Sequence, residues 1–166
     1  AMRGYTVFSL LLLFLSAVSA QTVPPGWNTV KDNKGLCQIA VPPEWSSLGE
    51  STGAAVYHDP TNAIAVVTSQ PGQAFKALPE PLVKSLEIPK ERMFENTAKR
   101  IFYQDQVSKG PEDSNRFSAS VPAKSGTCSC HVVVLPSIPV ETAKKIAMSL
   151  GPVASEGTPP DGSHSP

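Results

Sequence analysis

The sequence lacks an excess of charge of either sign. Its 14 basic residues are balanced by 14 acidic residues, and no long basic run occurs. Proteins that bind nucleic acid or an anionic membrane surface need a basic patch that attracts phosphate groups. We therefore expect neither partner for the folded part of the chain, which leaves another protein or a small ligand as the expected partner class.

The sequence also lacks the short motifs of several cofactor and metal enzymes. It contains no Gly-x-Gly-x-x-Gly dinucleotide loop, no phosphate-binding P-loop and no His-Glu-x-x-His metal motif. Of three histidines, only His58 and His131 lie outside the C-terminal tail as candidate bases. His58-Asp59 has the composition of a base with its orienting carboxylate, but Asp59-Pro60 fits the start of a turn better.

Long hydrophobic runs are missing except near the N-terminus. A basic start at Arg3 precedes a mostly apolar stretch over residues 7–15, and small residues up to Ala20 precede Gln21. This layout predicts a cleavable secretory signal peptide over residues 1–20, cut between Ala20 and Gln21. A retained membrane anchor and a pilin-like assembly helix are the alternatives. We expect the mature protein to be secreted or periplasmic.

Cysteine is scarce, with three copies in the chain. In an oxidising compartment two of them are expected to pair. Cys128 and Cys130 share one face of a predicted strand, where a bridge between them would be strained. The sequence therefore predicts a disulfide between Cys37 and either Cys130 or Cys128. The remaining cysteine is either buried and inert or a reactive thiol.

A thiol or metal site at Cys128, Cys130 and His131 is the alternative interpretation. Thioredoxin-like sites need two residues between their cysteines, and haem attachment needs Cys-x-x-Cys-His. Here one residue separates the cysteines, and His131 points to the opposite strand face. We therefore expect no metal and no cofactor, and these three residues remain the candidates of the alternative.

Alternating and β-branched residues on both sides of turn-forming residues predict short strands. In the first hairpin, Cys37, Ile39 and Val41 are expected on the inward face. The predicted strands over residues 63–68 and 128–135 contain stretches that are apolar on both faces, which is typical of central strands. The predicted strands cover residues 27–30, 36–41, 54–58, 63–68, 101–107, 116–121 and 128–135.

Proline positions and apolar spacing predict the helices. Pro81 fits the first residue of a short helix that ends near Leu86. Residues 90–99 are also predicted to be helical. Residues 139–150 form an amphipathic helix, and Gly151-Pro152 is expected to end it. Its apolar stripe consists of Val140, Ala143, Ile146, Ala147 and Leu150.

These elements predict a single globular α+β domain over residues 21–152. Its fold would be an antiparallel sheet of about six short strands with helices packed on it, including the amphipathic C-terminal helix. Residues 153–166 are rich in Gly, Pro and Ser and contain little that could be buried. We expect this tail to be disordered.

Three stretches resemble the PsbP-like class of α/β/α sandwiches, which are extrinsic proteins of photosynthetic membranes and their bacterial relatives. They are Gly26-Trp27, the strand end with prolines and Trp45 over residues 41–45, and the final helix over residues 143–150. The resemblance covers residues 26–151 and implies a PsbP-like sandwich. It implies no site residues, and the chain is also similar to exported bacterial proteins without a known site motif.

The composition favours an exported, non-enzymatic protein with a binding, structural or accessory role. A hydrolase whose site is assembled from distant residues is a further alternative. Aromatic residues could line a ligand groove, although core packing explains them better. They are Trp27, Trp45, Tyr57, Phe102 and Tyr103.

Overall fold

The computed structural model describes residues 22–51 and 53–154. The predicted signal peptide with its cleavage site at Ala20 and Gln21, and residues 155–166 of the predicted tail, lie outside this part. Within it, no helix is both long enough and apolar enough to span a membrane. The elements are β1 (Asn28–Lys31), β2 (Cys37–Val41), β3 (Ser46–Ser51), β4 (Ala54–His58), β5 (Ile64–Pro71), α1 (Glu80–Ser85), a 3-10 helix (Lys90–Arg92), β6 (Met93–Asn96), β7 (Ile101–Gln106), β8 (Asn115–Ala123), β9 (Gly126–Val134), α2 (Val140–Met148) and β10 (Gly151–Pro152).

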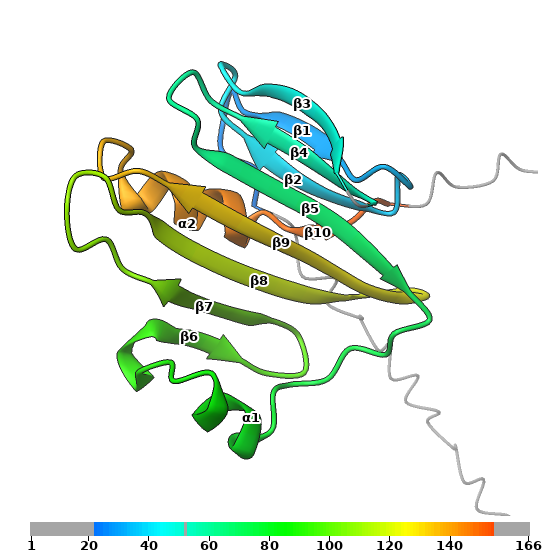
Figure 1. The fold of residues 1–166 in the computed structure, drawn as a ribbon. Coiled ribbons are helices and arrows are strands. Elements are labelled where there is room, and N and C mark those ends of the chain that lie inside the picture. Colours follow the sequence, from blue (N-terminus) through cyan, green and yellow to red (C-terminus); the bar gives the residue numbers. More distant parts are fainter. Residues whose placement is uncertain (1–21, 52, 155–166) are drawn as a thin grey trace, which may run out of the picture.

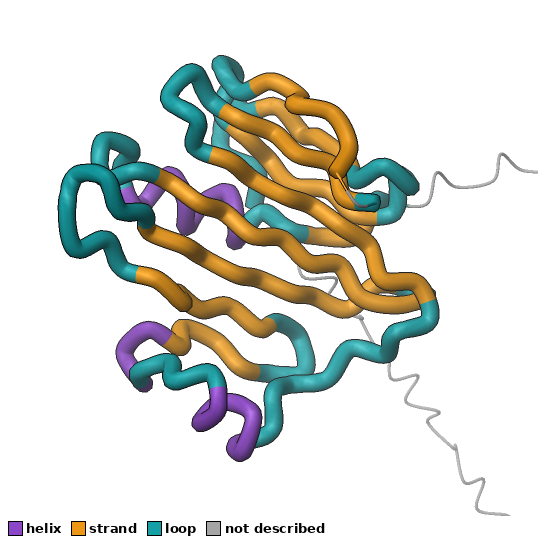
Figure 2. Tube along the Cα trace, in the orientation of Figure 1, coloured by secondary structure: helices purple, strands orange, loops and turns teal. Residues whose placement is uncertain are grey.

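Strands dominate the molecule, and every strand pair is antiparallel (Figures 1 and 2). Seven strands form one sheet in the order β3-β4-β5-β9-β8-β7-β6. A second sheet has the order β1-β2-β10. The structure thus confirms a sheet-rich antiparallel α+β fold, but its described residues form ten strands in two sheets rather than about six in one.

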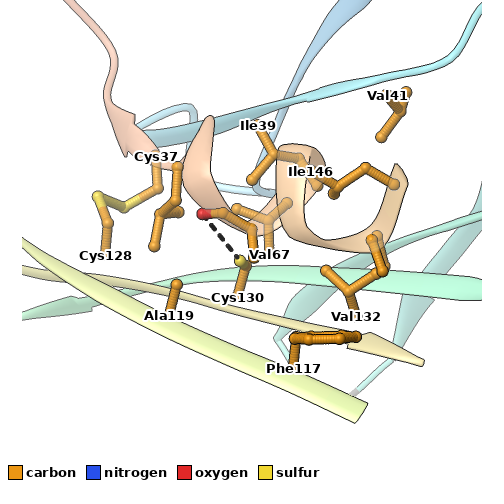
Figure 3. Packing of buried hydrophobic residues seen from close by; sticks show 14 of the residues in the cluster. Cys37, Ile39, Val41, Val67, Phe117, Ala119, Cys128, Cys130, Val132 and Ile146 are labelled. Atoms are coloured by element: carbon orange, nitrogen blue, oxygen red, sulfur yellow. Dashed lines mark hydrogen bonds between the residues drawn. A yellow bond between two sulfur atoms is a disulfide. The ribbon is translucent and has the colours of Figure 1, made fainter. Parts of the chain in front are cut away.

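The core lies between one face of the seven-stranded sheet and the layer formed by α2 and β2 (Figure 3). We call this face the inner face and the opposite one the outer face. Side chains alternate between the faces along each strand, so β9 sends Cys128, Cys130 and Val132 inward. On α2 the inward residues are the middle of the predicted apolar stripe, Ala143, Ile146 and Ala147, all fully buried.

The β1–β2 hairpin is fastened to the large sheet by a buried carboxylate. Asp32, in the turn, accepts hydrogen bonds from the Leu36 N–H at 2.7 Å, the Cys37 N–H at 2.8 Å and the Ser69 hydroxyl at 2.7 Å. Burial alone would raise the pKa of Asp32, but the backbone N–H donors and the Ser69 hydroxyl outweigh it and lower the pKa. Asp32 therefore stabilises the hairpin as an ionised group.

Two elements of the structure, β6 and β3, differ from the sequence-based expectation. Residues 90–99, predicted to be helical, form the short 3-10 turn and then β6, because pairing with β7 supplies backbone hydrogen bonds that a short irregular helix would lack. Strand β3 was not predicted, since its Ser- and Gly-rich sequence has no apolar alternation. It is a strand because β4 pairs with it.

The segment after α2 also continues further than predicted. Gly151-Pro152 ends the helix as expected, but it then pairs with β2 as β10. The Val153 N–H donates to the Leu36 carbonyl at 2.9 Å. Ordered chain therefore extends at least one residue into the tail that the sequence predicts to be disordered from residue 153.

Candidate functional site

The three residues of the predicted thiol or metal site lie in three different environments. Cys128 forms a disulfide with Cys37, one of the two pairings that the sequence left open. Cys130 is the free cysteine among the described residues and points toward α2, where its sulfur lies 4.0 Å from the Ala147 carbonyl oxygen (Figure 3). His131 lies on the outer face. The structure therefore does not bring these side chains together.

Cys130 is buried too deeply to act as a nucleophile. Burial raises the pKa of its thiol to about 12, although a backbone hydrogen bond from Ala119 and the charge of Arg100 act in the opposite direction. The thiolate is the reactive form of cysteine. The sequence allowed either a buried, inert cysteine or a reactive thiol. The environment of Cys130 is that of a buried, inert cysteine.

The outer face around His131 carries a connected group of polar side chains. His131 Nδ1 lies 2.9 Å from the hydroxyl of Ser118 on the neighbouring strand β8. Burial raises the pKa of the next side chain across the sheet, Tyr103, and a hydrogen bond with Ser118 offsets part of that rise. Thus Ser118 joins His131 on one side to Tyr103 on the other.

An ion pair borders this polar group. Arg116 Nε on β8 pairs with Asp105 Oδ2 on β7, while Asp105 Oδ1 is buried without a hydrogen-bond partner. His131 is an exposed residue, yet partial desolvation of its ring lowers the pKa. The charge of Asp105 opposes this shift, and the charge of Arg116 adds to it. His131 is therefore neutral at pH 7 and can donate and accept hydrogen bonds.

His58 and Asp59 form a turn, as the sequence favours. The Asp59 carboxylate accepts hydrogen bonds from the Thr61 N–H at 2.9 Å and the Ala63 N–H at 2.8 Å. His58 Nδ1 lies 3.0 Å from the backbone carbonyl oxygen of Asp59 rather than from its carboxylate. The pair therefore lacks the arrangement of a base with its orienting acid.

A segment between β5 and α1 crosses the outer face and is fixed at both ends. We call residues 73–79 the strap. At its start, the Thr127 hydroxyl donates to the Gln73 carbonyl at 2.8 Å. Near its end, the Asn96 side chain accepts from the Leu78 N–H at 2.8 Å and donates to the Leu78 carbonyl at 2.9 Å. The middle of the strap therefore spans the sheet between two fixed points.

The strap starts where the chain after β5 lies very close to the turn between β8 and β9. The Gly72 N–H donates to the Ser125 carbonyl at 2.7 Å, which turns the chain away from β5. Opposite, Gly126 packs against Gln70 so closely that a Cβ atom would meet the Gln70 carbonyl oxygen. A side chain at Gly126 would therefore displace the point from which the strap starts.

A groove of about 310 Å³ lies between the strap and the outer face. Its apolar walls come from the strap and α1, and Ile101 adds an apolar patch to its floor. Ser120 and Thr127 give the floor its hydroxyl groups. We call this space the strap groove. Its principal apolar residues are Phe75, Ala77, Leu78, Pro79, Leu82 and Ile101.

The aromatic residues considered in the sequence divide between core and surface. Trp45 and Phe102 are buried in the core, and Trp27 and Tyr57 pack at its edge. Tyr103 lies on the outer face beside Ser118, where it belongs to the polar group around His131.

Sequence reasoning missed the strap groove, because residues 73–79 have no periodic pattern and contact the sheet only through the tertiary fold.

Sequence reasoning also passed over Gly49–Gly53, whose spacing fits the Gly-x-Ser-x-Gly nucleophile elbow. That motif needs a strand followed by a helix. Here it joins the strands β3 and β4 at the edge of the sheet, so the context of an elbow is missing.

Within residues 22–51 and 53–154, no group of three or more His, Cys, Asp or Glu side chains is placed to hold a metal ion.

No protein-family model matches the chain, and no curated protein matches it. Among solved structures, a protein from Bacteroides thetaiotaomicron VPI-5482 is similar, with 12% sequence identity and a TM-score of 0.48. The match covers 74% of this chain and 47% of that protein, so the chain spans about half its length. A likeness of this size shows no function.

Proposed function

We propose that the protein is an exported, non-enzymatic binding protein whose ligand occupies the strap groove. The observation that carries the proposal is the groove itself, because ligand sites are concave, mostly apolar and supplied with a few fixed polar groups. Pockets for small ligands hold about 300–1,000 Å³. The strap groove, at about 310 Å³, suits a ligand at the small end of that range.

The lining defines the chemistry of the ligand. Phe75, Leu78 and Ile101 favour an apolar or aromatic body, while the Ser120 and Thr127 hydroxyls favour one or two neutral hydrogen-bonding groups. Lys76 is exposed, and none of the residues that line the groove is acidic. We therefore propose a small, uncharged aromatic or alicyclic ligand with a donor or acceptor at one end.

Calorimetric titration of the protein with indole, a neutral aromatic with one N–H donor, tests this assignment. Ala77→Trp places a large side chain of the strap into the groove, and we expect it to weaken indole binding at least about tenfold. Ala98→Trp, an exposed position in the turn between β6 and β7, is the matched control and should bind like the wild type. Equal binding by both variants, or no saturable binding by the wild type, would contradict the proposal.

Export is the second part of the proposal. It is supported by the secretory layout of residues 1–20 and by the disulfide between Cys37 and Cys128, because disulfides persist in oxidising compartments. N-terminal sequencing of the protein recovered from the periplasmic or culture fraction should begin at Gln21. Recovery of the protein only from the membrane with residues 1–20 attached would favour the anchor instead.

The PsbP-like arrangement also remains a proposal. It is supported by the order of the elements, with two early hairpins, three later strands and the final helix α2 on the sheet. The role expected for such a domain is a binding or accessory one, which agrees with a ligand groove and needs no catalytic group.

Hydrolysis is the second candidate function, favoured by one observation. Ser118 Oγ and His131 Nδ1 lie 2.9 Å apart, a distance typical of a nucleophile and its base. Among the described residues, however, Ser118 is the hydrogen-bond partner of the His131 ring, so no carboxylate orients the base. Turnover of p-nitrophenyl acetate that disappears in Ser118→Ala and His131→Gln would establish this function. Activity unchanged in both variants would exclude this pair.

A further inference from the structure

A second groove lies on the other side of the molecule, between α2 and the β6–β7 hairpin. Its volume is about 340 Å³, slightly larger than that of the strap groove. Phe94, Phe102 and Met148 form its apolar lining. Phe94 and Met148 are exposed by 40% and 37%, whereas Phe102 is anchored in the core at 5%. We call this space the helix groove.

The aromatic floor of the helix groove is held rigidly. The rings of Phe94 and Phe102 lie 4.9 Å apart between centroids, and Phe102 in turn lies 6.4 Å from the buried Phe117. These separations fall within the range of favourable aromatic pairs. The exposed Phe94 is therefore part of a chain of aromatic contacts that reaches the core, and its apolar surface stays available to a ligand.

Cationic groups surround this apolar floor. The Lys144 ammonium lies 4.9 Å from the centre of the Phe94 ring and 3.4 Å from Glu141. Lys145 also lines the groove and is exposed. It has no ion-pair partner among the residues that the structure describes.

Arg100 lies beside Met148, outside the lining of the groove. Its Nη1 lies 3.5 Å from the sulfur of Met148, and a thioether is a weak acceptor. Its Nε is buried and has no hydrogen-bond partner. Arg100 therefore contributes positive potential from beside the groove and is not a direct ligand contact.

Two acidic residues, Glu95 and Glu141, also line the helix groove, and each is engaged by a neighbouring side chain. Glu95 accepts a hydrogen bond from the Thr97 hydroxyl at 2.9 Å. Glu141 pairs with Lys144, but its side chain is 72% exposed. Such exposed pairs are weak, so a ligand anion can compete for the lysine.

We propose that the helix groove binds a small anionic amphiphile, with its apolar chain on Phe94, Phe102 and Met148 and its carboxylate at Lys144 and Lys145. The assignment follows from the two lysines beside the apolar floor, of which Lys145 has no ion-pair partner among the described residues. The site is separate from the strap groove, whose lining favours a neutral ligand, so the two proposals stand independently.

Titration of the protein recovered from the periplasmic or culture fraction with three probes that carry a ten-carbon chain tests the proposal. Decanoate should bind saturably, and decanol and decyltrimethylammonium should bind at least about tenfold more weakly, because they lack the negative charge. Backbone amide shifts in the decanoate titration should concentrate at Phe94, Lys144 and Met148. Equal affinity for all three probes, no saturable binding, or shifts confined to the strap would overturn the proposal.

Two variants locate the charge and the apolar contact. Lys144→Glu should weaken decanoate binding about tenfold, and Phe94→Ala should weaken the binding of decanoate and decanol alike. Lys124→Glu, at the exposed turn between β8 and β9, is the matched charge control and should leave affinity unchanged. If Lys144→Glu and Lys124→Glu reduce binding equally, the effect is one of net charge, and the helix groove is not the site.

Discussion

Cys130 and His131 are neighbours on β9, yet the first side chain is enclosed in the core and the second reaches the outer face. On the inner face, burial raises the pKa of the thiol and suppresses its chemistry. On the outer face, His131, Ser118 and Tyr103 keep polar atoms at a partly wet surface. The comparison teaches that the cysteines belong to the core-facing side of the sheet, while the polar group around His131 and the strap groove belong to the opposite side.

The reactivity of Cys130 should show the largest contrast between native and unfolded protein. With the pKa at about 12 against an ordinary 9.0, the thiolate fraction is lower by about a thousandfold at any pH well below both values. We expect no reaction with Ellman's reagent in the native protein and one reactive thiol per chain in denaturant. Rapid native reaction that disappears in Cys130→Ala would show that the inner face is open.

Removing the disulfide should cost the inner face far more stability than a comparable change on the outer face. The bond closes a loop across a sequence separation of 91 residues, and a loop of this length contributes about 4 kcal/mol in the chain-entropy model. Urea denaturation of Cys37→Ser/Cys128→Ser should reveal this loss. The control Ser120→Ala/Ser129→Ala removes an outer-face hydrogen bond of 2.9 Å and should cost about 1 kcal/mol. Similar losses would contradict the contrast.

Two adjacent valines of β9 allow the inner and outer faces to be compared on a single strand. Val132 is fully buried on the inner face, whereas Val133 is half-buried on the outer one. Val132→Ala should lower the free energy of unfolding by about 2 kcal/mol, since it leaves a cavity, and Val133→Ala by less than about 1 kcal/mol. The same denaturation experiment measures both. A larger loss for Val133→Ala would mean that the outer face is covered by something that the described residues do not include.

The hairpins and the final helix could be predicted from the sequence because their signals are local. Asp59-Pro60 marks a turn, the alternation of residues 116–121 marks a strand, and the stripe through Ile146 marks the buried side of α2. Strands β3 and β6 could not be predicted in this way, since partner strands determine them.

The candidate site was less accessible to sequence reasoning than the fold. Period-two alternation correctly separates His131 from Cys128 and Cys130. The choice of Cys128 as the partner of Cys37 depends on how β2 crosses the sheet, which no local pattern encodes. Likewise, the strap groove arises because Thr127 and Asn96 fix the strap at two points distant in sequence.

The pH dependence of stability should show the smallest effect. Burial lowers the pKa of His131 in the folded protein below its ordinary 6.5, so the unfolded state binds a proton first as the pH falls. The associated stability is complete above pH 6.5 and is lost as the pH drops toward the lower, folded-state pKa. Between pH 7.5 and 5.5, the wild type should therefore lose slightly more stability than His131→Gln. An identical loss in both proteins would mean that the outer face leaves this ring fully hydrated.

The most direct test of the strap groove as the site of the proposed neutral ligand is a map of backbone amide shifts on addition of indole. We predict saturable shifts that concentrate at Ile101, Ser120 and Thr127 on the floor of the strap groove and at the strap residues above them. Amides of Ile146 and Cys37 on the structural side should stay unchanged. Shifts concentrated on α2, or no saturable shift anywhere, would contradict the account.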